Sequence, residues 1–179
     1  GCSGKTEMWY VLRAEPGARI GVGLRERLPV ERLREASLSG EIEDLLAWRE
    51  VQPGDVFYIP AGTVHTLGAG ITLCEIQQQS DAPYRLYDYG RPRELHLEKA
   101  LAVANLEPHP GKSEPRKLAA HLARLVESPY FITDLMQIDS PCLETFEPRR
   151  GHILIFFEGE GLLDGQRFQA GEAWLIPQA

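Results

Sequence analysis

Short apolar runs, each closed by turn residues, recur along this chain and predict a fold built mainly of β-strands. Within the runs, aliphatic, β-branched and aromatic residues gather over six to eight positions, as is typical of strands. Gly, Pro and Asp fill the turns between them. Many short strands with such turns predict a sandwich or a barrel. The predicted strands are residues 7–12, 19–24, 55–60, 71–78, 131–138, 152–159 and 172–177.

Three other segments repeat their apolar residues every three or four positions, which predicts helices. These segments are residues 29–48, 96–106 and 115–128. Within the first segment, Gly40 predicts a break, because glycine disfavours a helix interior. Ser39 offers an N-cap to the half that follows.

A stretch rich in Pro, Gly and Ser separates the last two predicted helices and predicts a linker at residues 107–115. We therefore expect a first β unit at residues 1–106, with a helical insert at about 29–48. The remaining residues, 116–179, form a second β unit. In this second unit we find no set of side chains that would hold a metal ion, and we expect it to be structural.

An internal echo supports the division into two β units. "GDVFYIP" at 54–60 and "GEAWLIP" at 171–177 share a glycine, an acidic residue, an apolar run and a proline in the same register. The second copy stops before any counterpart of His65, and the first predicted strand begins almost at the start of the chain. We therefore expect both ends to be cut and the second unit to be truncated.

Charge and cysteine content narrow the classes of partner. A net charge of −7 argues against a nucleic-acid groove, which needs a basic face. Three cysteines without paired spacing indicate reduced thiols and a cytoplasmic location. Because no apolar stretch reaches the roughly 20 residues of a membrane span, we expect no membrane partner.

The segment "GDVFYIPAGTVHTLGAG" presents one histidine, His65, directly after a strand that ends at Pro60. Two interpretations are open: a structural histidine in a hairpin, or a metal ligand aimed by the bend that Pro60 and Gly62 create. The spacing G-x5-P-x-G-x2-H resembles the second conserved motif of the cupins, in which the histidine binds a metal at the mouth of a small barrel.

The strand "GKTEMWYVL" places Lys5, Glu7 and Trp9 on one face, because side chains alternate along a strand. One interpretation puts Lys5 and Glu7 in a surface salt bridge that adds little stability. In the other, Glu7 is an oxygen ligand beside His65 and Lys5 reaches an anionic substrate.

The segment "EIQQQSDAPYRLYDYGR" places Asp81 and Arg85 four residues apart, soon after His65. An arginine here would suit bidentate binding of a phosphate. The other interpretation is an exposed loop of mixed charge.

Four blocks of the sequence occur in a fixed order: "GKTEMWYVL", "PGDVFYIPAGTVHTLGAGI", "EIQQQSDAPYRLYDYGR" and "LHLEKAL". Together they closely resemble the type I mannose-6-phosphate isomerases (phosphomannose isomerases) of the cupin superfamily, in their shorter bacterial and archaeal form. The resemblance covers residues from about 4 to 105. The tail "EGEGLLDGQRFQAGEAWLIP" is similar to the C-terminal cupin-like unit of that family.

This resemblance implies a cupin-type jelly-roll barrel followed by a second, smaller cupin-like β unit, with a few short helices. It implies one zinc ion per active site, with Glu7 and His65 as two of its ligands. It also implies that Lys5 and Arg85 bind the substrate, and that Arg85, Lys5 and Asp81 are catalytic.

The other two zinc ligands of the family lie in a Gln-x-His-Pro stretch upstream of the first block, and this sequence has no such stretch. Its one His-Pro pair, His109-Pro110, lies in the predicted linker. We therefore expect the chain to lack the N-terminal part of its family.

The implied activity is interconversion of mannose 6-phosphate and fructose 6-phosphate, by metal-dependent proton transfer between C1 and C2 through an enediol(ate). The carbon base stays open among Asp81, Lys5 and a metal-bound hydroxide. The expected partner is a small sugar phosphate, and the chain is expected to be a monomer or to depend on the missing N-terminal segment.

Two other functions remain open. A non-catalytic sugar-binding or regulatory cupin would fit a chain that lacks two metal ligands. However, a decayed site would have lost some of the five candidate residues, which are Lys5, Glu7, His65, Asp81 and Arg85. Another metal cupin, such as a dioxygenase, would need an HxH pair, and the sequence has none.

Overall fold

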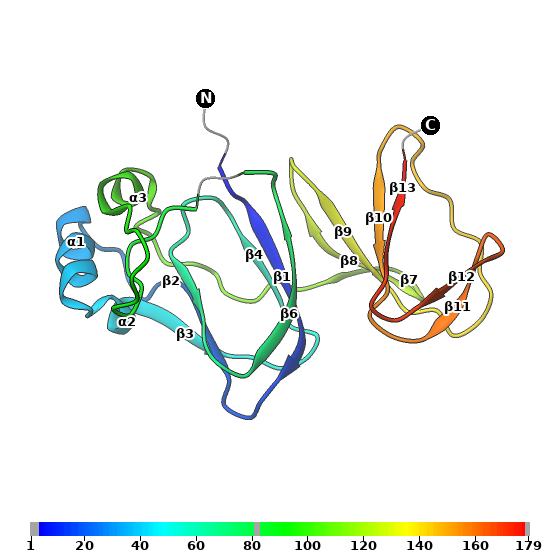
Figure 1. Cartoon of the computed structure of the whole chain (residues 1–179), viewed down its shortest axis with the longest axis horizontal. Helices are drawn as coiled ribbons and strands as arrows, with labels where there is room; N and C mark the ends of the chain where they lie inside the picture. Colours follow the sequence, from blue (N-terminus) through cyan, green and yellow to red (C-terminus); the bar gives the residue numbers. More distant parts are fainter. Residues whose placement is uncertain (1–3, 81–82, 178–179) are drawn as a thin grey trace. The chain divides into compact units, whose positions relative to one another are not determined.

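A computed structural model of the chain describes residues 4–80 and 83–177. The chain divides into two compact units, of which the first ends at Gln137 and the second begins at Ile138. The described residues form short strands with three helices among them, as Figure 1 shows. The predicted fold class, mainly β, is confirmed, with the strands in separate small sheets rather than one closed barrel.

Two three-stranded antiparallel sheets form the centre of the first unit. One sheet has the order β4 (Val56–Ile59), β1 (Glu7–Ala14), β6 (Ile71–Gln77). The other has the order β3 (Leu46–Glu50), β2 (Arg19–Leu24), β5 (His65–Leu67). Apolar side chains from both sheets bury one another and form the inner core: Trp9, Val11, Ile20, Val22, Phe57 and Ile59.

Strand β1 is buried on both faces. Trp9 belongs to the inner core, and Met8 belongs to a second cluster on the opposite face of the same sheet. This is the alternation expected of a strand, and it places Glu7 on the inner side with Trp9. The prediction that Glu7 and Trp9 share a face is confirmed.

Two further layers cover the outer faces of these sheets (Figure 1). The helices α1 (Val30–Ser39), α2 (Ile42–Leu45) and α3 (Leu97–Val103) pack around Leu24 at the end of β2. Strands β7 (Arg116–Ala119), β8 (Leu122–Glu127) and β9 (Ile132–Met136) form a third sheet. Leu125 and Val126 of this sheet pack against Met8 and Val56.

The helices at residues 29–48 and 96–106 are confirmed, with shorter bounds. Gly40 ends α1 with a φ of 89°, and its backbone N–H donates to the carbonyl of Ala36. A left-handed residue at this position suits glycine, so the predicted break is also confirmed. The chain then passes through α2 into β3, a strand that was not predicted because its first residues fall within the predicted helix. No helix within the described residues has the length and apolar character that crossing a membrane requires.

The predicted helix at residues 115–128 is wrong, because this segment forms β7 and β8. Its residues have good helical propensity, but β8 lies between β7 and β9 in a sheet. The guanidinium of Arg124, on β8, pairs with the carboxylate of Asp134, on β9, at 2.9 Å. Packing of Leu125 against β1 and β4 outweighs the local preference, as tertiary context commonly does.

Residues 107–115 run along the edge of β4 that faces away from β1. The backbone N–H of Ser113 donates to the carbonyl of Val56 at 2.8 Å, and its Oγ accepts from the N–H of Tyr58 at 3.2 Å. His109 Nε2 donates to the carbonyl of Tyr58 at 2.8 Å. The segment predicted as a linker thus satisfies backbone groups that an exposed edge would leave open.

The second unit contains two strand pairs. These are β10 (His152–Ile155) with β13 (Ala173–Ile176), and β11 (Glu160–Leu163) with β12 (Gln166–Gln169). Phe156, Phe168 and Trp174 pack together, with the two phenyl rings stacked at 4.1 Å between centroids. Both copies of the internal echo are strands, β4 and β13.

We predict that Leu125→Ala lowers the free energy of unfolding by about 2–4 kcal/mol, whereas Leu118→Ala lowers it by less than about 1 kcal/mol. Leu125 is 6% exposed and Leu118 is 38% exposed. In a helix these two residues, seven apart, would share one face and be buried alike. Urea unfolding of both variants measures the difference, and equal losses would contradict the strand assignment.

We also predict that His109 makes stability depend on pH. Burial lowers the pKa of the His109 imidazole, and the charge of Arg49 lowers it further. Below about pH 6.5 the unfolded chain therefore binds a proton that the folded chain resists. The free energy of unfolding should fall between pH 7.5 and pH 5 in the wild type, and fall less in His109→Gln. Equal falls in urea titrations would contradict this.

Candidate functional site

Three of the predicted site residues meet at one end of the inner layer. Lys5 Nζ lies 2.6 Å from Glu7 Oε1, and His65 Nε2 lies 3.6 Å from Glu7 Oε2. Glu7 comes from β1 and His65 from β5, so the two opposed sheets each deliver one side chain to the same place. The interpretation of Lys5 and Glu7 as a surface salt bridge is wrong, because Glu7 is buried.

The carboxylate of Glu7 is satisfied on one oxygen only. Glu7 is 2% exposed. Its Oε1 accepts a hydrogen bond from Lys5, whereas its Oε2 has no hydrogen-bond donor among the described residues. An unpaired buried acceptor costs about 1–3 kcal/mol, and more when it is charged. The fold therefore leaves one oxygen of a buried carboxylate without a donor, which is the condition that a cation ligand requires.

The imidazole of His65 is oriented for the same task. Its Nδ1 lies 2.8 Å from the carbonyl oxygen of Thr63. Because a carbonyl only accepts, Nδ1 carries a hydrogen, and in the neutral form of the ring Nε2 then has the lone pair. The ring also meets Trp9 edge-on, with centroids 5.3 Å apart. A backbone carbonyl on the second ring nitrogen, such as that of Thr63 on Nδ1, is typical of histidines that bind metals.

The turn before His65 depends on Gly62. The N–H of Thr63 donates to the carbonyl of Pro60, and the N–H of Asn105 donates to the carbonyl of Gly62. Gly62 has a φ of 88°, and a Cβ at this position would lie 2.5 Å from the carbonyl oxygen of Val103. Only glycine accepts both the conformation and the close approach.

The spacing of the two free atoms fits a shared metal ion. At 3.6 Å, His65 Nε2 and Glu7 Oε2 are too far apart to hydrogen-bond to each other. A tetrahedral zinc ion with ligands about 2.1 Å away separates two ligand atoms by roughly 3.4 Å. An imidazole nitrogen and a carboxylate oxygen are both ordinary zinc ligands. The residues present therefore fit two corners of such a site.

Glu75, on β6, is a site residue that the sequence analysis missed. Its Oε2 accepts from the indole N–H of Trp9 at 2.8 Å, and its Oε1 lies 3.6 Å from Lys5 Nζ. The alternation of β6 would have revealed it, because Glu75 pairs with Trp9 in register and so shares its inner face. Burial opposes the charge of Lys5, but Glu7 and Glu75 outweigh it and raise the pKa of the ammonium.

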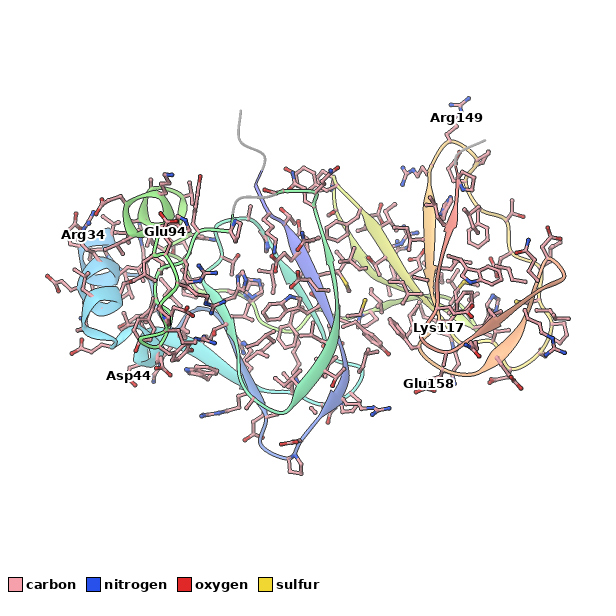
Figure 2. The ribbon with its side chains drawn as sticks, viewed as in Figure 1. Arg34, Asp44, Glu94, Lys117, Arg149 and Glu158 are labelled. Atoms are coloured by element: carbon pink, nitrogen blue, oxygen red, sulfur yellow. The ribbon has the colours of Figure 1, made fainter. Side chains whose placement is uncertain are left out.

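Arg85 lies in the loop after β6, and Asp88 anchors that loop. The buried carboxylate of Asp88 pairs with Arg93, and with Arg91 at 2.8 Å, and the hydrogen bond from Arg93 lowers its pKa. Arg85 Nη1 donates to the carbonyl oxygen of Glu94 at 3.0 Å. Glu94 is labelled in Figure 2, on the helical side of the first unit.

Among the described site residues, no side-chain hydrogen bond joins Arg85 to the other three. Within the described part of the chain, the side-chain hydrogen bond of Arg85 goes to Glu94 and not to Lys5, Glu7 or His65. Asp81 lies outside the described residues, so its place relative to the others stays a prediction.

Comparison with known proteins identifies relatives along almost the whole chain. No protein-family model matches it. The mannose-6-phosphate isomerase of Streptococcus mutans is 40% identical over 144 residues, which covers 75% of this chain and 45% of that protein. The mannose-6-phosphate isomerase ManA of Bacillus subtilis is 34% identical, with 97% of this chain and 59% of that protein covered. The chain spans about half the length of the curated relatives it matches.

Solved structures give the same result. The crystal structure of the mannose 6-phosphate isomerase from Bacillus subtilis has a TM-score of 0.80 and 29% identity, covering 99% of this chain and 60% of that one. A variant of the phosphomannose isomerase from Salmonella typhimurium has a TM-score of 0.73 at 18% identity, which shows likeness of fold alone. By its sequence and its fold, the chain belongs to the mannose-6-phosphate isomerase family.

Proposed function

We propose that this chain carries part of the active site of an enzyme that interconverts mannose 6-phosphate and fructose 6-phosphate. One observation carries the proposal: in a chain of this family, the unpaired Oε2 of buried Glu7 faces the free Nε2 of His65. Because the chain spans about half of its relatives, the activity is proposed for the whole protein.

Glu7 and His65 would hold a metal ion, and we propose that it is zinc, one per active site. When bound, zinc supplies a positive charge that polarises the sugar oxygens and stabilises the negative charge of an enediolate. The protein's own contribution is rigidity. Glu7 is fixed between Ile59 and Gln77 in the central strand of its sheet, and His65 is fixed through Thr63 and Trp9.

Lys5 would act on the substrate as a positively charged acid. Its ammonium already sits beside a carboxylate at the open end of the inner layer, with about a quarter of the side chain exposed. There it would neutralise charge that develops on a sugar oxygen, or donate a proton to that oxygen. A lysine held in its charged form by Glu7 is a poor base. This leaves Asp81 as the chain's own candidate for the base that removes the proton from carbon.

Arg85 would bind the phosphate group. A guanidinium suits bidentate contact with phosphate oxygens, and among the described residues Arg85 donates a hydrogen bond to the backbone carbonyl of Glu94. A hydrogen bond to a neutral carbonyl would be easier to exchange for a phosphate than a hydrogen bond to a carboxylate would be.

For the cellular setting, we propose a monomeric protein of the cytoplasm that acts on a small sugar phosphate. Cys74 and Cys142 are free thiols in the structure, which agrees with a reducing compartment.

The test is zinc content per chain after loading and exhaustive dialysis, for the wild type, for His65→Ala and for His152→Ala. His152, in the second unit, is the matched control. We expect about one zinc in the wild type and in His152→Ala, and a loss of most of it in His65→Ala. A coupled assay for fructose 6-phosphate, run on the zinc-loaded proteins, then measures isomerisation.

Zinc retained equally by His65→Ala would contradict the assignment of the metal site. If the whole protein binds zinc but does not isomerise, a rise in its melting temperature on adding mannose 6-phosphate would instead favour a non-catalytic sugar-binding role.

A further inference from the structure

The side chain of Glu75 is held more firmly than an exposed glutamate would be. Its Oε2 accepts a hydrogen bond from the indole N–H of Trp9, and Trp9 is 2% exposed within the inner core. Trp9 and Glu75 also pair in register across β1 and β6. The rigid indole therefore fixes the carboxylate in place, with Oε1 directed towards Lys5.

The ammonium of Lys5 thus lies near two carboxylates, those of Glu7 and Glu75. Its Nζ lies 2.6 Å from Glu7 Oε1 and 3.6 Å from Glu75 Oε1. A shift of about 1 Å, which a flexible four-carbon side chain makes readily, would exchange the closer partner for the more distant one.

The two carboxylates differ in how much they need the ammonium. The side chain of Glu7 is 3% exposed and that of Glu75 is 34% exposed. A buried carboxylate has little water to compensate its charge, so the ammonium lies closer to Glu7. Glu75 has both water and the Trp9 indole, and it can take or release Lys5 at lower cost.

We infer that Glu75 is a positioning residue that receives the Lys5 ammonium when Glu7 binds a cation. This rests on the proposed metal site at Glu7 and His65. The Lys5 ammonium lies 2.6 Å from the Glu7 carboxylate. A cation bound to that carboxylate would therefore repel the ammonium. Glu75 gives the ammonium a fixed second position, so that Lys5 stays at the site instead of turning into solvent.

The net charge of Lys5, Glu7 and Glu75 also supports a role for Glu75 in cation binding. Glu7 and Lys5 alone are neutral together, which is unfavourable for attracting a cation. With Glu75 the three groups carry a net charge of −1. Removing the charge of Glu75 would therefore matter most while Lys5 is present, and the effect should depend on that lysine.

A double-mutant cycle in zinc affinity tests this dependence. The four proteins are the wild type, Glu75→Gln, Lys5→Met and the double variant, with Glu50→Gln as a control for loss of an exposed strand glutamate. Each is titrated with zinc alone against a competing chelator dye. We expect Glu75→Gln to weaken zinc binding about tenfold, as loss of a supporting partner commonly does. In the Lys5→Met background the same change should cost less than about threefold.

Equal weakening by Glu75→Gln in both backgrounds would overturn the inference and leave the metal site intact, because Glu75 would then act without Lys5. No weakening in either background would overturn it as well. If neither the wild type nor Lys5→Met binds zinc, the proposed metal site itself fails, and this inference fails with it. Weakening by Glu50→Gln as large as by Glu75→Gln would reduce the effect to general charge.

Discussion

The carboxylate of Glu7 is the group on which this end of the protein depends. A charge that is 2% exposed needs compensation, and the fold compensates it with one ammonium on one oxygen. The other oxygen is left facing His65 Nε2 at 3.6 Å. A core would tolerate such a half-satisfied acid poorly unless it gained a partner, and a metal ion is the partner that both atoms fit.

The layers of the first unit explain why Glu7 can be buried there. Strand β1 is central in its sheet, with the inner core on one face and the third sheet on the other. Helices cover the facing sheet that supplies His65. Glu7 and His65 therefore sit on strands of two sheets that are each packed on both faces. In the exchange that we propose, the backbone stays in place and only the Lys5 side chain moves.

Much of this arrangement is readable from the sequence, and the exceptions have physical causes. The alternation of "GKTEMWYVL" predicts that Glu7 and Trp9 share a face, and the proline-glycine bend predicts the turn before His65. Propensity misleads over residues 115–128, because packing of Leu125 against β1 decides the outcome. Glu75 was missed because its contacts are to Trp9 and Lys5, which come from another part of the chain. The sequence of one strand does not show which strand it pairs with.

The most direct test of the claim that Glu7 and His65 bind one metal ion is a crystal structure of the zinc-loaded chain. Anomalous diffraction would be measured at the zinc absorption edge. The account predicts one strong anomalous peak within about 2.2 Å of both Glu7 Oε2 and His65 Nε2, with Lys5 Nζ moved towards Glu75. Zinc bound elsewhere, or an unchanged Lys5–Glu7 pair with no peak beside it, would contradict the claim that this end of the fold is a metal site.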